Sequence, residues 1–497
     1  MSQAKKAFIG SLTLTFSRLS ERLLGLVSTL ITARLLLPED FGLVAIAMIV
    51  IGFFSIMAMT GSNQYIIQKE SVSEQDLDTA WTLDLIMKGG IFLLLIIIAP
   101  LISEYYEDER LTNVIYVLST MLLFSAFSNP ALMLKHRDQA YRPIFILDVA
   151  RKIFAISTVI TVAYVYRNYW AMVCGHIVSN AVGFIGSYLV VRYRPKLSFH
   201  GLKEQWLFSK WMLSKGFMGY FRSQVDTIIV SHFYGTSQVG GYHVTKYIST
   251  MPGSQIITPA TSPLLATFSR TKNQPAEFEH QVKLTLLVLQ VLAFPMTAYL
   301  FVFSQPLVGL LLGEKWLNFS HIFAILALLT LPLAIGNVVS QILTSKRQVQ
   351  TLFYYDLLSL IAVCVALLLV RDFALPQFAW VRVMMDYFAV LLLFSFSLYK
   401  YTGIKFLSTL LTFVVTVTVA FTGAYLVKMG IGDLNSPILT LLVTASSYAI
   451  LWGVFALVAY KLYFKKTQEG MHLQFLVVSL IRSVLSKFNL HNRNTMG

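Results

Sequence analysis

Charged side chains are scarce in this chain of 497 residues, since Asp, Glu, Lys and Arg make up 13% of it. Soluble globular domains carry about 25% charged residues, so the composition excludes an ordinary soluble protein. Hydrophobic residues account for 56%, and the mean hydropathy is +0.67. Apolar runs such as 90–102, 410–420 and 439–459 are long enough, with their flanks, to cross a hydrocarbon core about 30 Å thick. The sequence therefore predicts an all-α polytopic membrane protein.

Cysteine is almost absent. The only two cysteines, Cys174 and Cys364, lie in apolar stretches, which excludes a disulfide framework and a cysteine-based metal cluster. We find no phosphate-binding P-loop and no nucleophile elbow, and only the C-terminal tail is expected to exceed roughly twenty residues outside the membrane. A nucleotide-driven pump would need another subunit, and a sugar polymerase would need a larger external domain. We therefore expect a protein that is not an enzyme and that holds no cofactor or metal.

Apolar segments separated by polar breaks predict fourteen membrane spans. With an inside N-terminus, the inner segments and the tail hold 23 Lys and Arg residues and the outer segments hold six. Because cytoplasmic loops are rich in Lys and Arg, this bias predicts cytoplasmic termini. It also assigns the net charge of +15 to the membrane surface rather than to nucleic acid. The predicted spans are 8–36, 41–65, 79–103, 111–133, 143–166, 169–191, 207–233, 239–264, 284–304, 319–342, 352–370, 377–398, 404–427 and 437–460.

A weak internal repeat divides the spans. Residues 16–21 and 38–43 have counterparts in residues 221–226 and 236–242, so each half opens with a charged helix and a short turn containing Gly. Such repeats place a substrate site between two halves. The predicted parts are an N-terminal lobe (1–195), a C-terminal lobe (196–402) connected through the basic loop 192–205, two extra spans (403–462) and a basic cytoplasmic tail (463–497) with an amphipathic helix at 472–488.

At least twelve ionisable residues lie within these spans. A charge near the centre of a membrane helix costs about 2.5–3.5 kcal/mol, so we expect these side chains to line a shared wet cavity or to pair with each other. Asp148 and Arg151 are shallow and more typical of an interface. The candidates for a substrate cavity are Arg18, Glu21, Arg22, Asp84, Lys88, Lys215, Arg222, Asp226, Arg382 and Asp386.

Two spans carry the clearest polar faces. Arg18 and Arg22 begin a stripe at helical spacing in the first span, and Arg222 and Asp226 end one in the seventh. The set has a small positive excess, which favours an anionic group such as pyrophosphate. A purely structural alternative stays open, in which arginines reach the headgroups and Arg–Asp pairs only neutralise each other. Carboxylates such as Asp226 could instead carry protons.

The order and spacing of several motifs resemble those of the Wzx-like oligosaccharide flippases of the multidrug/oligosaccharidyl-lipid/polysaccharide exporter superfamily. The matching pieces cover essentially the whole chain: Arg18, Glu21 and Arg22, then residues 36–42, 61–68, Arg222 with Asp226, 239–242 and 259–270. The sequence departs from that pattern in 264–270, where a Pro is expected nearer the Ser-Arg pair. This departure leaves the subfamily and the glycan unassigned.

The resemblance implies two six-helix lobes in a V, with spans 1, 2, 7 and 8 around the cavity. It also implies export of an undecaprenyl-pyrophosphate-linked oligosaccharide across the bacterial cytoplasmic membrane for surface polysaccharide, by alternating access. Membrane lipids, a polysaccharide polymerase and chain-length machinery are the implied partners, and a proton or sodium gradient is a candidate driving force. Three alternatives stay open: a drug or metabolite antiporter, a peptidoglycan-precursor flippase, and a membrane-embedded glycosyltransferase or polymerase.

Overall fold

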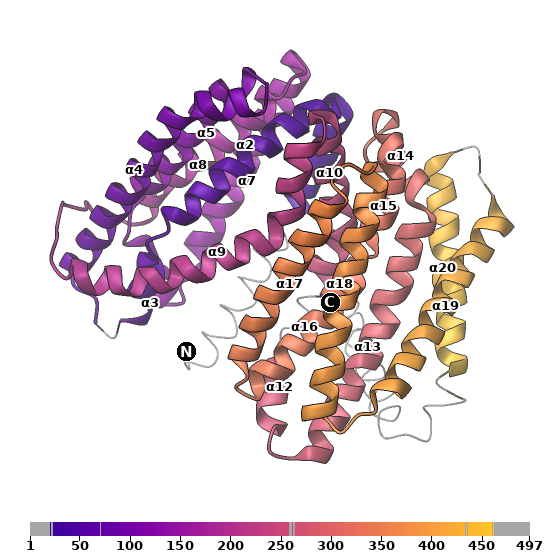
Figure 1. Cartoon of the computed structure of the whole chain (residues 1–497). Helices are drawn as coiled ribbons and strands as arrows, with labels where there is room; N and C mark the ends of the chain where they lie inside the picture. The colour runs from indigo at the N-terminus through magenta and orange to yellow at the C-terminus, as the bar shows by residue number, and fades with distance from the viewer. Residues whose placement is uncertain are drawn as a thin grey trace, which may run out of the picture. The chain divides into compact units, whose positions relative to one another are not determined.

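The computed structural model describes residues 20, 23–69, 71–257, 261, 264–432, 434, 436–459 and 461, and all regular elements in these ranges are helices (Figure 1). Contacts divide the chain into two compact units, which we describe separately. Unit 1 comprises Met1–Thr245, Leu311–Phe319 and Leu360–Phe378. Unit 2 comprises Lys246–Leu310, Ser320–Ser359 and Ala379–Gly497.

Unit 1 contains the helices of the first half of the chain and the start of the second. They are Leu23–Leu35, α2 (Pro38–Met57), α3 (Ser62–Gln68), α4 (Glu74–Tyr105), α5 (Arg110–Ala126), α6 (Leu132–Arg137), α7 (Tyr141–Tyr166), α8 (Trp170–Val190), α9 (Leu202–Phe233) and most of α10 (Thr236–Pro252). The loop 192–205, predicted to connect two lobes, therefore lies inside unit 1. The predicted division at residues 195 and 196 stays a prediction.

The predicted spans correspond to helices, and nine helices in the described ranges are long and apolar enough to cross a membrane. The second span ends earlier than predicted. Its helix α2 stops at Met57, and the short helix α3 begins after Gly61, the N-cap residue, which adopts φ +65° in the left-handed region that favours glycine. The eighth span is also broken, since α10 passes into a π-helix, η1 (Gly253–Ile257), after Pro252.

Helix α4 begins with a capping box, which fixes the point where the chain enters its longest apolar helix. The Ser73 hydroxyl accepts a hydrogen bond from the Asp76 amide (3.2 Å), and the Asp76 carboxylate accepts one from the Ser73 amide (2.9 Å). At 1.5 Å per residue, the 32 residues of α4 span about 48 Å. This helix is therefore longer than the hydrocarbon core, and its ends reach the headgroup regions.

Two later segments of the chain complete unit 1. The 3-10 helix η2 (Glu314–Phe319) buries Trp316 completely. The segment 360–378 covers the C-terminal end of α9, where the Tyr234 hydroxyl donates to the Phe373 carbonyl oxygen (2.8 Å). Residues from the second half of the chain thus cover the C-terminal end of α9 and form part of unit 1.

Unit 2 is an aromatic-rich helical bundle. The rings of Phe394 and Phe413 stack with centroids 5.7 Å apart, and Phe294 meets Phe413 edge-on at 5.3 Å. The two last spans, predicted as extra helices, pack against α13, since the Trp452 indole donates to the Val291 carbonyl (3.1 Å). Its helices are α12 (Leu264–Thr271), α13 (Pro275–Val302), α14 (Ser304–Leu311), α15 (Ser320–Ala327), α16 (Thr330–Ser345), the first half of α17 (Val349–Leu369), most of α18 (Leu375–Tyr401), α19 (Phe406–Ile431) and α20 (Pro437–Ala459), because residues 360–378 belong to unit 1. The predicted tail helix 472–488 lies outside the described residues.

Candidate functional site

The centre of unit 1 contains an ion pair in the middle of a membrane span. Lys88 and Asp84 lie one turn apart on α4, and the Lys88 Nζ is 2.6 Å from the Asp84 Oδ2. Lys88 also donates to the Ser125 hydroxyl of α5 (3.0 Å), and the Thr60 hydroxyl donates to Asp84. Each charged side chain is 16% exposed. The sequence prediction that these two residues pair is therefore confirmed by the geometry.

The ammonium group of Lys88 retains capacity for a ligand. Lysine has three donor hydrogens, and Asp84 and Ser125 account for two among the described residues. The next two residues of α4 leave open space beside the helix, because a Cβ added at Gly89 or Gly90 would meet no atom within 4 Å. An anionic group arriving on this face would find a cation held in place by a carboxylate and a hydroxyl.

Asp226 is fully buried on α9 and joins α9 to α10. Its carboxylate accepts a hydrogen bond from the Tyr242 hydroxyl (2.8 Å) and from the Thr227 backbone amide (2.8 Å). Tyr242 is itself fully buried, and its ring meets Phe378 edge-on at 6.2 Å. A carboxylate in this position is held by a phenol as well as by its own helix, which the sequence did not indicate.

The other predicted cavity residues of unit 1 lie on α9 or outside the described residues. The Arg222 side chain is exposed on α9, one turn before buried Asp226. Lys215 lies on the same helix, but its side chain is outside the described residues, as are Arg18, Glu21 and Arg22 entirely.

In unit 2, Arg382 and Asp386 form an ion pair one turn apart on α18. Their side chains are 10% and 24% exposed. This pair resembles Asp84 and Lys88 in spacing, because residues i and i+4 share one helix face. Helical spacing thus predicted the Asp84–Lys88 pair in unit 1 and the Arg382–Asp386 pair in unit 2, whereas the pairing of Arg222 with Asp226 stays a prediction.

The N-terminal turns of α2 and α10 cross in direct backbone contact, a feature we call the glycine crossing (Gly42, Gly240 and the turns beginning at Pro38 and Thr236). A Cβ added at Gly42 would lie 1.8 Å from the Thr236 carbonyl oxygen, and one at Gly240 would lie 1.8 Å from the Pro38 carbonyl oxygen. The contact is reciprocal: each glycine lies against the residue that starts the other helix. Only glycine permits two backbones to approach this closely.

Trp316 of η2 packs beside the glycine crossing. Its indole Nε1 donates to the Ala33 carbonyl oxygen (2.8 Å), and its ring meets Phe41 edge-on at 5.2 Å. The neighbouring Phe319 lies against Gly241, where an added Cβ would be 2.0 Å from the ring. Sequence reasoning missed both this cluster and the crossing, although the repeated Gly of 38–43 and 236–242 was a signal for the crossing.

Long apolar helices with ion pairs placed along them define a multi-pass membrane protein with polar groups inside its spans. The chain belongs to the polysaccharide biosynthesis protein family, which matches residues 31–321. It is 21% identical over 340 residues to the lipopolysaccharide biosynthesis protein WzxC of Escherichia coli (strain K12), covering 67% of this chain and 68% of that one. It is 22% identical to the teichuronic acid biosynthesis protein TuaB of Bacillus subtilis (strain 168), over 61% and 64% of the two chains. It is 23% identical to the succinoglycan biosynthesis transport protein ExoT of Rhizobium meliloti (strain 1021), over 61% and 62%.

Solved structures share the fold. A lipid II flippase MurJ in an inward closed conformation matches with a TM-score of 0.71 at 12% identity, over 90% of this chain and 98% of that one. An inward-facing multidrug resistance MATE family transporter of the MOP superfamily matches with a TM-score of 0.58 at 12% identity, over 77% and 94%. These likenesses confirm the predicted all-α polytopic fold.

Proposed function

We propose that this protein moves a polyprenyl-pyrophosphate-linked oligosaccharide across the bacterial cytoplasmic membrane during surface polysaccharide synthesis. The family match over residues 31–321 carries the proposal, and it agrees with relatives whose names refer to lipopolysaccharide biosynthesis and to succinoglycan biosynthesis transport. The paired Lys88 supports it, since a lipid-linked pyrophosphate needs a cation inside the membrane region.

The proposed transport cycle is alternating access. With the predicted orientation, α2 and α10 both begin on the outer side, so the glycine crossing closes unit 1 on that side. Release of a glycan to the outside requires the two helix ends to separate. Opening on the inner side would then admit the next lipid-linked glycan while the crossing is closed.

Charged residues of unit 1 have distinct roles in this proposal. Arg22 and Arg222 attract the pyrophosphate, and Lys88 offers a further cation on α4. Asp226 is the candidate for coupling to a proton or sodium gradient, because protonation would weaken its hydrogen bond from the Tyr242 hydroxyl and loosen α9 from α10. The lipid tail stays in the bilayer, and no bond is made or broken.

The test is complementation of a strain that lacks this protein. Surface polysaccharide is measured for Arg22→Ala, Arg222→Ala and Lys88→Met at protein levels matched by immunoblot. We expect each variant to reduce polymer at the surface and to raise the lipid-linked precursor inside the cell. Wild-type polymer from all three variants would remove these cations from the mechanism.

A membrane-embedded glycosyltransferase is the rival from another class. The purified protein in detergent is incubated with a lipid-linked sugar, where no leaflets exist. A transporter leaves the sugar chemically unchanged there, whereas an enzyme turns it over. New glycosidic product would overturn the proposed function.

A further inference from the structure

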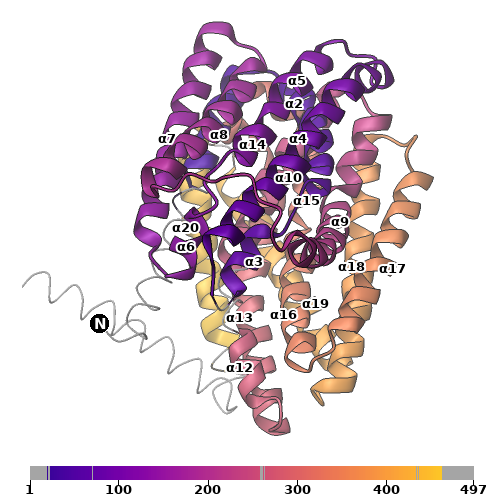
Figure 2. The same ribbon diagram turned by 90° about the vertical axis from the view of Figure 1, so that its left-hand side faces the viewer.

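The connection between α8 and α9 is an extended segment, and it is hydrogen-bonded to the N-terminal end of α4 (Figure 2). Its Tyr193 hydroxyl donates to the Asp78 carboxylate (2.7 Å), and its Ser198 amide donates to the Thr82 hydroxyl (2.9 Å). From the other side, the Asn129 side-chain amide donates to the Val191 carbonyl oxygen (2.7 Å). We call residues 191–206 the strap, and these bonds fix its conformation.

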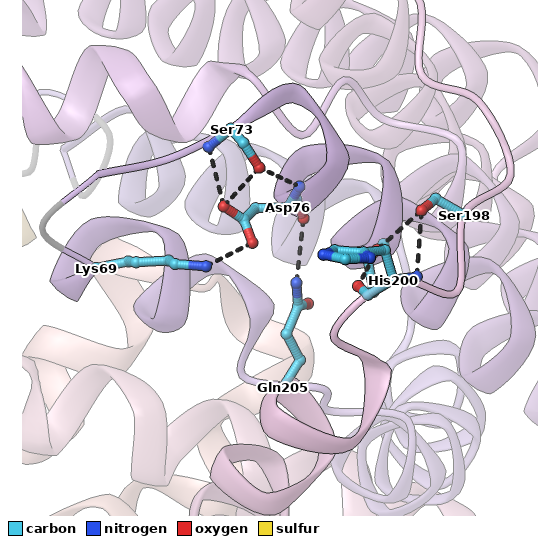
Figure 3. A network of polar contacts seen from close by, with 7 residues as sticks. Lys69, Ser73, Asp76, Ser198, His200 and Gln205 are labelled. Carbon is cyan, nitrogen blue, oxygen red and sulfur yellow. Dashed lines mark hydrogen bonds and ion pairs between the residues drawn. The ribbon is translucent and has the colours of Figure 1, made fainter.

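A second network anchors the strap where α9 begins (Figure 3). The Gln205 side chain is 1% exposed and donates to the Asp76 carbonyl oxygen (3.1 Å), while the Thr79 hydroxyl donates to the His200 carbonyl oxygen (2.7 Å). The Asp76 carboxylate is 2.7 Å from the Lys69 Nζ, and this hydrogen bond raises the pKa of Lys69 to about 12. The strap is therefore a fixed surface of unit 1.

The strap faces an acidic residue of α4 on one side and has basic residues on its exposed side. Asp78 of α4 is turned inward, accepting hydrogen bonds from the Tyr193 hydroxyl and the Lys196 amide (2.9 Å). The side chains that alternate with Tyr193 are exposed and basic, and none of them donates to a described residue: they are Arg192, Arg194 and Lys196. Glu74 is an exposed acid among the described side chains nearby, and its backbone carbonyl oxygen accepts a hydrogen bond from the Tyr193 hydroxyl. The outer face of the strap thus has a positive excess.

Large apolar side chains stand among these cations. Leu197 is 67% exposed, Phe199 is 63% exposed and Trp206 is 42% exposed. An acidic soluble partner would match the charge but not this apolar surface. The strap binds α4 within its first nine residues, and α4 exceeds the hydrocarbon core by about 18 Å, so the strap lies at headgroup depth.

We infer that the strap is a docking surface for anionic phospholipid headgroups, with Arg192, Arg194 and Lys196 on the phosphates and Leu197 and Phe199 in the acyl boundary. Basic residues beside an anionic leaflet each favour binding by roughly 5-fold. Aromatic side chains such as Trp206 prefer the same depth. Because the strap is already ordered, lipid binding does not have to fix its backbone.

The test uses the full chain in vesicles and reads Trp206 fluorescence, taken as the difference between the parent and Trp206→Phe. Brominated phosphatidylglycerol or brominated phosphatidylcholine is titrated as the quencher. We expect an anionic preference of about 5-fold or more that weakens with salt. It should fall towards equality in the triple variant Arg192→Gln, Arg194→Gln, Lys196→Gln.

A control triple variant removes the same number of charges from exposed positions elsewhere, namely Arg167→Gln, Lys315→Gln and Lys405→Gln. It should keep the anionic preference, and thermal unfolding in detergent checks that both variants fold. Equal quenching by the two lipids in the parent would overturn the inference. So would a strap variant that keeps its preference, or a polyglutamate peptide that changes Trp206 fluorescence in detergent when the anionic lipid does not.

Discussion

The glycine crossing offers the sharpest test of the proposed transport cycle, in which the N-terminal ends of α2 and α10 separate. In Gly240→Ala, the new Cβ would lie 1.8 Å from the Pro38 carbonyl oxygen, whereas ordinary contact begins at 3.4 Å. The obstacle is backbone, so the two helices must separate by about 1.6 Å. Overpacking of this kind typically costs about 1–3 kcal/mol. We therefore expect the closed crossing to lose roughly 5- to 150-fold in population relative to the open one.

Gly219→Ala is the matched control, because a Cβ there meets no atom within 4 Å. Both substitutions gain about the same helix propensity, roughly 1 kcal/mol, so their difference isolates the clash. The assay labels Val239→Cys, fully buried in the parent, with a membrane-impermeant maleimide after Cys174 and Cys364 are replaced. Labelling should speed up in Gly240→Ala and stay slow in Gly219→Ala.

Gly42 and Gly240 belong to one reciprocal contact, so their substitutions should not have additive effects. Once Gly240→Ala has moved the helices apart, Gly42→Ala should add little, so the double variant costs less than the two single variants together. Equal labelling rates for Gly240→Ala and Gly219→Ala would refute the tight crossing. Fully additive effects would refute the claim that both glycines belong to one contact.

Three further outcomes are expected. Trp316→Phe should keep the ring contact but lose the indole hydrogen bond, lowering the free energy of unfolding by about 1–2 kcal/mol in denaturant or thermal measurements. Lys88→Met should destabilise unit 1 by about 3–5 kcal/mol, because it leaves Asp84 unpaired, and adding Asp84→Asn should restore most of that loss while transport stays impaired. The Arg110 guanidinium holds the pKa of Asp108 below its usual range, so its stabilising effect is present above about pH 4 and is lost as pH falls through the lowered pKa. Arg110→Gln should flatten the acid-side fall of the thermal midpoint.

Much of the fold could be read from the sequence because the bilayer imposes it. An apolar run must form its hydrogen bonds within itself, so each run predicts a helix. The breaks within the spans were harder to predict. Helix α2 ends at Met57 inside an apolar stretch, and the chain turns into α3 through the left-handed conformation of Gly61. The assignment of segments 311–319 and 360–378 to unit 1 could not be predicted, because it depends on tertiary contacts of Trp316 and Tyr234.

The candidate site was predictable only in part, because the sequence indicates contacts within one helix but not contacts between helices. Helical spacing identified Asp84 with Lys88, since partners one turn apart need no knowledge of the fold. The hydrogen bond from Tyr242 to Asp226 crosses between helices, so no local pattern indicates it. The roles assigned to Arg22 and Arg222 stay predictions.

The glycine crossing and Trp316 differ in the size of the contact that each makes. Two glycines bury no side chain, so their crossing gains only close van der Waals contact and is easily reversed. Trp316 buries a whole indole and donates a hydrogen bond to the Ala33 carbonyl oxygen, so it holds η2 against the residues that precede α2. Substituting Trp316 should therefore lower stability with little change in how closely α2 and α10 approach. Substituting either glycine should instead change that distance first, because a Cβ at either position would lie 1.8 Å from a backbone oxygen of the other helix.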